Sequence, residues 1–352
     1  MAGRLPETGI GDENFRPVSG GWQHPSGRGC ADGGAVGTIG GPAPAFGPRF
    51  DAYVPPSGYL WWYLDAVSGD GRFAITLIAF VGSVFSPYYA WSGRRDPLNH
   101  CAVNVALYGP RGARWAMTER GRGAVARDEK QLRIGPSRLR WQGGVLKIDI
   151  DEISAPFPRR IRGTIRVTPA SFPERAFALD AAGNHLWYPI APRARIDVVL
   201  EHPDLAWSGT GYLDSNFGAE PLAAGFRDWT WSRAHLAQDS IVLYDAKRRD
   251  GSDVSLALRF GQDGAVEGLT SPPLVKLPAT GWRLTRRTRA DAGHAVHLHR
   301  TLEDTPFYAR SQLQTQLCGE RADIFHESLS LDRFDRSIVH AMLPFRMPRR
   351  FV

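Results

Sequence analysis

Four side chains suited to acid chemistry lie in two short stretches near the middle of the chain. Tyr212 and Asp214 belong to the Gly-rich stretch 207–222, and His185 and Trp187 precede that stretch by roughly 20 residues. Alternate side chains of an extended strand lie on one face of a sheet. Tyr212 would therefore share a face with Asp214, and His185 with Trp187. Two such strands side by side would gather a carboxyl, an imidazole, an indole and a phenol, a set suited to an acid that stays protonated beside an apolar substrate.

The same pattern also has a purely structural interpretation. Gly-rich stretches that contain one Asp commonly form turns, and Trp and Tyr at strand spacing commonly belong to a core. The residues alone leave both interpretations open.

The composition favours a protein built from strands. Of the 352 residues 43% are hydrophobic, which is enough for a large core, and the 38 Gly and 26 Pro favour short strands and turns over long helices. No segment has the apolar period of an amphipathic helix of three turns, and one short helix is expected at Ser337–Leu343. The expected strands are Tyr59–Asp65, Arg72–Gly82, Ala102–Tyr108, Arg114–Thr118, Gln131–Ile134, Leu139–Trp141, Val145–Ile150, Ile161–Thr168, Ile196–Leu200, Trp229–Ala234, Ser240–Asp245, Val254–Phe260, Gly281–Arg287 and Val296–Arg300. The sequence therefore predicts an all-β fold with very little helix.

The length of the chain favours two structural modules. Residues 1–45 contain 12 Gly and 5 Pro without an apolar period, and we expect a poorly ordered extension there. The remainder is expected to form an N-terminal β-domain over residues 46–203 and a C-terminal β-domain over residues 204–352.

The net charge and the spacing of the cysteines argue against several classes of function. The net charge is +7, but the basic residues are scattered without a dense run, so no nucleic-acid partner is expected. The three cysteines lie far apart without a Cys-x-x-Cys pair, which is typical of a reducing compartment and not of a disulfide scaffold or a zinc site. The N-terminus has no signal-peptide pattern. The longest apolar run, Phe73–Phe85, is shorter than the roughly 20 residues of a helix that spans a bilayer, so any membrane contact is expected to be peripheral.

Several catalytic motifs are missing from the sequence. There is no Gly-x-Ser-x-Gly elbow, no Walker loop and no complete dinucleotide fingerprint. His297 and His299 would share a strand face, but no Cys or carboxylate at ligand spacing completes a set, so an exposed strand is favoured over a metal site. We interpret Asp65 as a turn or capping carboxylate, with a place in a pocket wall as the alternative. We interpret Arg286 as a solvated strand position, with contact to lipid phosphates as the alternative.

Seven further stretches carry a family resemblance together with the Trp207–Leu222 motif. They are Gly58–Asp65, Ile78–Tyr89, Asn104–Gly109, Arg114–Arg120, Trp229–Ala234, Leu302–Arg310 and Met342–Arg349. Over residues 50–350 the chain resembles the carotenoid 1,2-hydratases of photosynthetic bacteria, the hydroxyneurosporene synthase family. Several of the motifs are long and aromatic, which makes the resemblance specific.

The resemblance implies both a fold and a chemistry. The family is similar to proteins built from two lipocalin-like β-barrel or sandwich modules packed together. The family's proposed proton donor is the Asp of a Gly-Tyr-x-Asp-x-Asn motif, which corresponds to Asp214, and its companions correspond to His185, Trp187 and Tyr212. The implied reaction adds water across the terminal C1–C2 double bond of an acyclic carotene such as neurosporene or lycopene. It runs through a tertiary cation and needs neither a metal nor a cofactor. Apolar surroundings would raise the pKa of the donor carboxyl, because desolvation disfavours its charged form.

Aromatic side chains are expected to line the substrate pocket, namely Trp61, Tyr63, Phe85, Tyr88, Tyr89, Trp229 and Trp231. The implied partners are an acyclic carotenoid, water and membrane lipid. We expect peripheral association with the cytoplasmic side of the photosynthetic membrane, through Arg349–Phe351 or the Phe85–Tyr89 loop.

Two alternative functions stay open. One is a lipocalin-like carrier that binds an apolar ligand without changing it, and the other is a related hydratase or cyclase that acts on another prenyl substrate.

Overall fold

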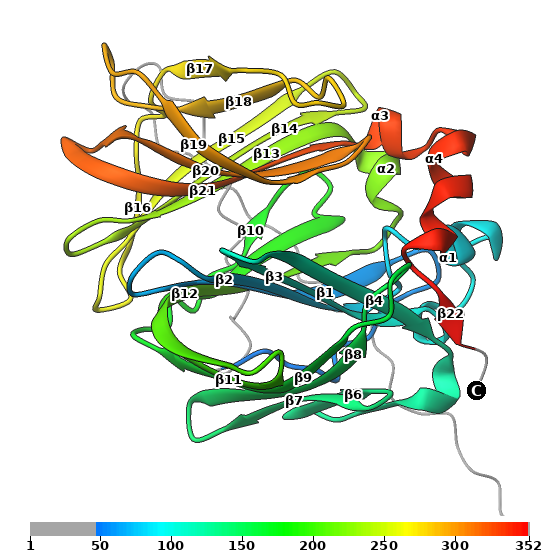
Figure 1. Ribbon diagram of the computed structural model, residues 1–352. Coiled ribbons are helices and arrows are strands. Elements are labelled where there is room, and N and C mark those ends of the chain that lie inside the picture. The colour runs from blue at the N-terminus through cyan, green and yellow to red at the C-terminus, as the bar shows by residue number, and fades with distance from the viewer. Residues whose placement is uncertain (1–46, 351–352) are drawn as a thin grey trace, which may run out of the picture. The chain divides into compact units, whose positions relative to one another are not determined.

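The protein is built almost entirely from antiparallel β-sheet (Figure 1). The structure, a computed structural model, describes residues 47–350. The all-β prediction with very little helix is confirmed. The extension predicted at residues 1–45 lies outside the described residues.

The largest sheet of the described chain has 13 strands and takes up most of the first two thirds of the sequence. Its hydrogen-bonded order is β22-β4-β3-β2-β1-β12-β11-β9-β8-β7-β6-β5, and β10 pairs with β11. The strands are β1 (Tyr59–Ser68), β2 (Ala74–Val81), β3 (Cys101–Gly109), β4 (Gly112–Arg120), β5 (Val125–Arg127), β6 (Gln131–Ile134), β7 (Ser137–Gln142), β8 (Val145–Ile153), β9 (Arg160–Pro169), β10 (Phe177–Ala178), β11 (His185–His202), β12 (Leu205–Gly218) and β22 (Arg349–Arg350).

The second sheet has the order β16-β15-β14-β13-β21-β20-β19, and β17 pairs with β18 in a small separate sheet. These strands are β13 (Phe226–His235), β14 (Ser240–Arg248), β15 (Asp253–Phe260), β16 (Val266–Gly268), β17 (Leu274–Leu277), β18 (Arg286–Arg289), β19 (His297–Asp304), β20 (Tyr308–Leu317) and β21 (Glu320–Ser330). The short helices are α1 (Pro87–Trp91), α2 (Leu222–Gly225), α3 (Leu331–Phe334) and α4 (Ser337–Met342), with 3₁₀ turns η1 (Pro97–Asn99), η2 (Arg122–Ala124) and η3 (Leu343–Phe345).

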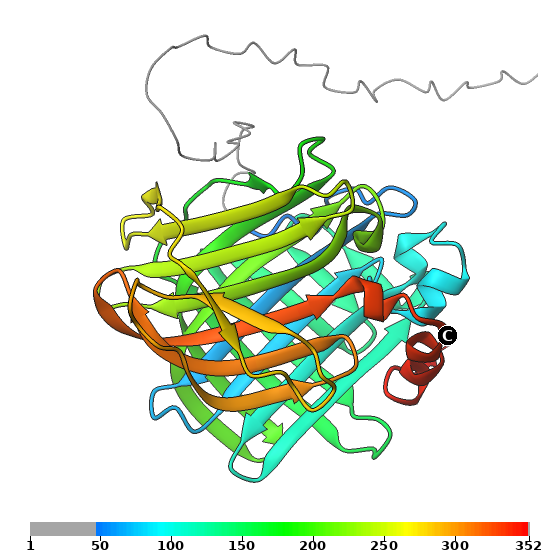
Figure 2. The same ribbon diagram turned by 90° about the horizontal axis from the view of Figure 1, so that it is seen from above.

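The first sheet folds over on itself, and the second sheet lies across its outer face (Figures 1 and 2). The strand β1 shows how both sides are filled. Trp62 and Leu64 point into the apolar core inside the folded first sheet, whereas the alternate residues Trp61 and Tyr63 point into a second, aromatic core between the two sheets. Because both faces of β1 are buried, nearly every residue of the strand is apolar or aromatic.

A cluster of buried charges joins the two sheets. Asp65 of β1 accepts hydrogen bonds from Arg233 of β13 and from Arg310 of β20, and Arg310 also pairs with Glu327 of β21. Asp65 and Arg310 are fully buried. The interpretation of Asp65 as a turn or capping carboxylate is therefore wrong, because its partners come from the second half of the chain.

The structure corrects two further expectations and contains strands that were not expected, of which β20 and β21 are the longest. The strand predicted at Gly281–Arg287 begins only at Arg286, because residues 280–284 form a turn in which Arg283 takes a positive φ of 56°. Arg286 is not solvated, since it is buried and donates to the carbonyl oxygen of Pro278 and to the hydroxyl of Ser311. The strands β20 and β21 were not predicted, because inward polar residues interrupt their apolar alternation. The helix expected at Ser337–Leu343 is confirmed by α4.

The predicted module boundary at residues 203 and 204 lies in the turn before β12. That strand is hydrogen-bonded between β1 and β11 of the first sheet, and the chain enters the second sheet at β13. The division into two modules stays a prediction.

We predict that Asp65→Ala lowers the free energy of unfolding by about 3–5 kcal/mol, because it leaves two buried guanidinium groups without their carboxylate. Glu201→Gln is the matched control, since the Glu201 side chain is 60% exposed and pairs with Arg162 at the surface. Losing such a pair costs about 0–1 kcal/mol. Urea unfolding of both variants measures the difference, and equal losses would show that the buried cluster does not stabilise the fold.

Candidate active site

Three antiparallel strands in the middle of the first sheet position the predicted catalytic residues. In the register of β12, Asp214 lies opposite Tyr63 of β1 on one side and Pro189 of β11 on the other. Trp187 lies opposite Asn216, so it is diagonal to Asp214 on the same face of the sheet. The glycines of the 207–222 motif make close packing possible. At Gly218 a Cβ atom would lie 2.1 Å from the ring of Tyr59.

Asp214 has one oxygen that is fully hydrogen-bonded and one that is not. Its Oδ2 accepts from Trp187 Nε1 at 2.8 Å and from the Tyr212 hydroxyl at 2.7 Å, and the indole also approaches that hydroxyl at 3.1 Å. Its Oδ1 is buried and has no hydrogen-bond partner among residues 47–350. Because a carboxylate requires partners for both oxygens when it is buried, this arrangement favours the neutral acid with its proton on Oδ1.

The surroundings of Asp214 change its acidity in the same direction. The side chain is 4% exposed, and burial raises the pKa of Asp214 from 3.8 to about 7. The hydrogen bonds from Tyr212 and Trp187 oppose the shift, while the charges of Glu327 and Asp65 add to it. Burial also raises the pKa of Tyr212 well above its ordinary value, so its hydroxyl stays a donor. Asp214 is therefore a carboxyl that can give up a proton near neutral pH.

His185 lies on the same strand as Trp187 but contacts residues other than Asp214. Its Nδ1 is 2.9 Å from the Tyr59 hydroxyl, and its Nε2 is 3.2 Å from Oε1 of Glu220. One tautomer satisfies both contacts, with Tyr59 donating to Nδ1 and Nε2 donating to Glu220. Burial lowers the pKa of His185, which favours this neutral ring. The structure thus brings Trp187 and Tyr212 to Asp214, whereas both ring nitrogens of His185 are engaged elsewhere.

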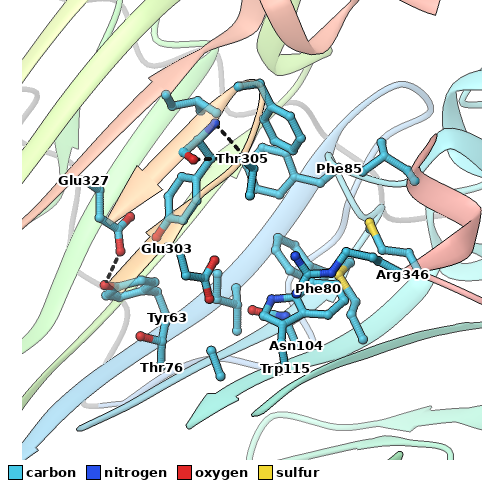
Figure 3. Close-up of a pocket in the computed structure, with 18 of the residues that line it drawn as sticks. Tyr63, Thr76, Phe80, Phe85, Asn104, Trp115, Glu303, Thr305, Glu327 and Arg346 are labelled. Carbon is cyan, nitrogen blue, oxygen red and sulfur yellow. Dashed lines mark hydrogen bonds between the residues drawn. The ribbon is translucent and has the colours of Figure 1, made fainter. Parts of the chain in front are cut away.

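A cavity of about 470 Å³ lies between the two sheets, and Asp214 is part of its wall. Figure 3 shows part of the wall from close by, with Tyr63, Glu303 and Glu327 among the labelled residues. Most of its wall is aromatic or aliphatic. The first sheet contributes Trp61, Tyr63, Ile78, Phe80, Asn104, Trp115, Met117, Asp214 and Asn216, among others, and the second sheet contributes Trp229, Trp231, Tyr244, Glu303, Asp304, Tyr308, Glu327 and Leu329. The remaining wall comes from loops and from the C-terminal segment that includes α4 and η3.

Most of the residues predicted for the pocket line this cavity. They are Trp61, Tyr63, Phe85, Trp229 and Trp231. Tyr88 and Tyr89 do not line it. The Tyr89 hydroxyl donates to the carbonyl oxygen of Gly58 at 2.8 Å, and the ring of Tyr88 packs against Trp91. Trp187 and Tyr212 also lie outside the wall, because they are fully buried behind the carboxyl that they contact.

Three carboxyl groups of the cavity wall were not predicted from the sequence, those of Glu303, Asp304 and Glu327. Glu303 accepts a hydrogen bond from the Tyr108 hydroxyl at 2.6 Å, and burial raises the pKa of Glu303. Glu327 accepts from the Tyr63 hydroxyl at 2.7 Å (Figure 3) and is also paired with Arg310. Glu303 belongs to the Leu302–Arg310 motif, where an acidic residue inside an otherwise apolar and aromatic stretch was the signal available.

Two further observations concern metals and membranes. His297 and His299 are exposed on β19, and no group of His, Cys, Asp or Glu within residues 47–350 is arranged to hold a metal ion. Among the same residues, no helix combines the length and the apolar character needed to cross a bilayer.

Comparison with known proteins identifies the family. The family model for the carotenoid hydratase CrtC matches residues 77–352. The chain belongs to the carotenoid hydratase family CrtC. It is 55% identical to an acyclic carotenoid 1,2-hydratase of Thiocapsa roseopersicina over 99% of this chain and 87% of that protein. It is 51% identical to one of Rubrivivax gelatinosus over 86% of this chain and 76% of that protein. The CrtC family carries out carotenoid hydration in carotenoid biosynthesis, which is a hydro-lyase activity, so the protein is an enzyme and not a carrier.

Solved structures support the fold of this CrtC protein. An AttH protein of Nitrosomonas europaea, 14% identical, matches with a TM-score of 0.58 over 84% of this chain and 99% of that one. The crystal structure of CghA with Sch210972, also 14% identical, matches with a TM-score of 0.50 over 82% of this chain and 95% of that one. At this identity the likeness concerns the β-fold alone.

We predict that Tyr212→Phe moves the pKa of Asp214 upward from about 7, because the Tyr212 hydrogen bond is what most opposes the effect of burial. The infrared band of the protonated carboxyl, followed through a pH titration, measures the shift, and its loss in Asp214→Asn assigns the band. Tyr188→Phe is the control, since Tyr188 faces the core inside the first sheet. A pKa that stays the same or falls in Tyr212→Phe would contradict the prediction.

Proposed function

We propose that this hydratase adds water across the terminal C1–C2 double bond of an acyclic carotenoid and that Asp214 supplies the proton. The observation that carries the proposal is the state of the Asp214 carboxyl in the cavity wall. Its Oδ2 accepts two hydrogen bonds, and its Oδ1 has no partner among residues 47–350. Lycopene and neurosporene are the substrates that we propose.

The chemistry requires an acid that is neutral and kept away from water. An alkene is a weak base, so only an undissociated acid placed next to it transfers a proton at a useful rate. Burial keeps the proton on Asp214 up to a pH of about 7. Trp187 and Tyr212 hold Oδ2, which leaves Oδ1 to carry the proton. A carboxyl held neutral by apolar surroundings is an established catalytic device, and ketosteroid isomerase uses one as a hydrogen-bond donor.

The proposed reaction has two steps that balance. Asp214 transfers its proton to C2, the electron pair of the double bond forms the new C2–H bond, and C1 becomes a tertiary cation. A water molecule then forms the C1–O bond and loses one proton, which returns to Asp214. The product is a tertiary alcohol, and the acid is restored. The addition of water is redox-neutral, so we propose that no cofactor takes part.

Aromatic rings next to Asp214 are suited to stabilise the cation. Trp231 lines the cavity, and its ring centroid lies 5.0 Å from that of Tyr212 and 5.4 Å from that of Tyr63. Ring faces attract a desolvated cation by about 2 kcal/mol. We propose this role for Trp231 and Tyr63, which line the cavity. Trp187 and Tyr212 would instead orient the carboxyl, because both donate to its Oδ2. His185 would act at a distance, by fixing Tyr59 and the end of β12.

The cavity can hold only one end of the substrate, because an acyclic carotenoid is a long polyene and the cavity is about 470 Å³. Such a molecule dissolves in lipid and not in water. We therefore propose that the protein associates peripherally with the photosynthetic membrane, on its cytoplasmic side, and takes up one end of the chain at a time.

We predict that Asp214→Asn folds but loses roughly 10²–10⁴-fold in turnover, because an amide cannot donate the proton that a general acid supplies. Purified protein is incubated with lycopene or neurosporene in liposomes made in oxygen-18 water without added cofactors. Mass spectrometry then detects a product that carries one labelled oxygen. Turnover like that of the unsubstituted protein would remove Asp214 from the role of donor.

The stability of Asp214→Asn serves as the folding control, and the direction in which it changes with pH follows from the pKa of Asp214. The pKa of Asp214 is raised in the folded state, so the stability gained from its proton is complete below pH 3.8 and lost as the pH rises through about 7. The asparagine has no such loss. Between pH 5 and pH 8 the free energy of unfolding of the variant should therefore rise relative to that of the unsubstituted protein, by a few kcal/mol at most, as measured by urea unfolding.

We predict that Trp231→Leu lowers turnover roughly 10- to 30-fold and that Trp231→Phe lowers it less, because phenylalanine keeps a ring face toward the cation. Steady-state rates with liposome-borne substrate measure the effect, and substrate binding by the inactive Asp214→Asn background separates it from a loss of affinity. Equal losses in both variants would argue against stabilisation of a cation by this ring.

A further inference from the structure

Three apolar side chains of the cavity wall are also exposed at the surface. Trp282 is 51% exposed, Met342 is 42% exposed and Phe345 is 74% exposed, and all three line the cavity. A side chain that both lines a cavity and meets solvent lies at its opening. These residues therefore mark the mouth of the cavity.

The helix α4 presents an apolar face to solvent beside this mouth. Ile338, Ala341, Met342 and Phe345 are all exposed, and their spacing of three and four residues places them on one side of the α4–η3 segment. Val339 lies on the other side, buried in the cavity wall. The segment is thus apolar toward the cavity and apolar toward the outside. We call Trp282, Ile338, Met342 and Phe345 the apolar rim.

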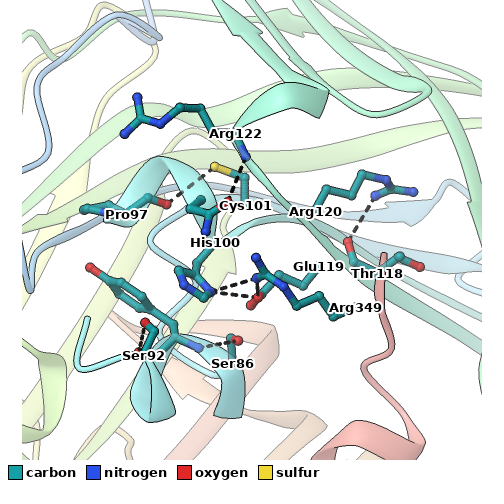
Figure 4. A network of polar contacts seen from close by, with 12 residues as sticks. Ser86, Ser92, Pro97, His100, Cys101, Thr118, Glu119, Arg120, Arg122 and Arg349 are labelled. Atoms are coloured by element: carbon teal, nitrogen blue, oxygen red, sulfur yellow. Dashed lines mark hydrogen bonds and ion pairs between the residues drawn. The ribbon is translucent and has the colours of Figure 1, made fainter. Parts of the chain in front are cut away.

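Both parts of the rim are fixed to the body of the protein. Arg333 of α3 donates to the carbonyl oxygens of Trp282 at 2.8 Å and of Arg283 at 2.9 Å, which ties the 280–284 turn to the segment before α4. After the rim, Arg349 pairs with Glu119 of β4 and lies 2.9 Å from Nδ1 of His100 (Figure 4). The α4–η3 segment is therefore anchored both before and after the rim residues that it contributes.

The chain around the rim is basic. Residues 336–350 contain Arg336, Arg346, Arg349 and Arg350 and no Asp or Glu. Arg336, Arg346 and Arg350 are exposed, and the Arg346 guanidinium lies 4.6 Å above the Trp115 ring in the cavity wall. The carboxylates closest to the rim have partners of their own, since Asp332 and Asp335 pair with Arg249, and Asp304 accepts a hydrogen bond from the backbone N–H of Gly281 beside Trp282. Exposed apolar side chains flanked by arginines suit a surface of anionic lipid.

We propose that the apolar rim is the surface by which the protein docks on an anionic lipid bilayer, with the rim side chains in the headgroup region and the arginines on lipid phosphates. The inference rests on the proposed function, because a substrate dissolved in lipid must reach the cavity through its mouth. Docking there lets the end of the polyene pass from the bilayer to Asp214 without crossing water. It assigns the contact to a surface formed by α4, η3 and the 280–284 turn. The contact was first predicted for the Phe85–Tyr89 loop or for Arg349–Phe351, whose last residue lies outside the described residues.

The binding test uses vesicles without carotenoid. The full-length protein is sedimented with phosphatidylglycerol vesicles and, separately, with phosphatidylcholine vesicles. We expect stronger binding to the anionic vesicles, weakened by salt, and a roughly tenfold lower partition coefficient for Phe345→Ser. Phe157→Ser is the matched control, because Phe157 is 76% exposed in the turn between β8 and β9. Equal losses in both variants, or no binding at all, would overturn the proposal.

A second variant links docking to turnover. Ile338 is 66% exposed and lies outside the cavity wall, so Ile338→Ser should leave hydration of a detergent-dispersed carotene unchanged. Hydration of the same carotene in anionic vesicles should fall several-fold. Unchanged rates in vesicles would reject the rim as the docking surface. The absence of hydrated product from the unsubstituted protein in both media would instead reject the proposed function. A dimer in solution that Phe345→Ser dissociates would identify the rim as a contact between two copies and would also overturn the proposal.

Discussion

Two carboxylates and two guanidinium groups are buried between the sheets, and the position of the cavity depends on them. Burying a charge is expensive unless an opposite charge meets it directly. Asp65 comes from the first sheet, whereas Arg233, Arg310 and Glu327 come from the second, so only one docking of the sheets pairs all four. The cavity begins beside this cluster, because Glu327 and its partner Tyr63 are part of the wall.

The same interface contains a second carboxyl, whose hydrogen-bond partners are neutral instead of charged. Asp214 lies opposite Tyr63 in the sheet, and Asp65 is only two residues further along β1. Asp65 meets two arginines, whereas Asp214 meets an indole N–H and a phenol O–H, both of them neutral donors. The absence of a cation among these contacts is what allows burial to keep a proton on Asp214. A carboxyl that pairs with the arginines of β13 and β20 is therefore an anion that stabilises the structure. Asp214, which pairs with neither arginine, is the carboxyl that can act as an acid.

The sequence predicted the parts of this arrangement that depend on local pattern. Strand spacing was enough to group Tyr212 with Asp214 and to give the all-β fold, and the long aromatic motifs were enough to suggest the family. The partners of Asp65 and Arg286 were not predictable, because those contacts join residues from distant parts of the chain. Whether Trp187 or Trp231 faces the cavity depends on how the second sheet packs over the first. The spacing of the side chains alone does not contain that information.

The pairing of β1 with β12 also affects how fast the chain can fold. The strand β1 pairs along its whole length with β12 although more than a hundred residues separate them in the sequence, and part of the cavity wall comes later still, from residues 339–347. Sheets dominated by such distant pairings form slowly. During synthesis, the aromatic face of β1 has no partner until the second sheet has been made, and exposed apolar surface of this kind promotes aggregation. The contacts that surround the acid with apolar side chains in the folded enzyme thus leave the nascent chain open to aggregation until the second sheet has formed.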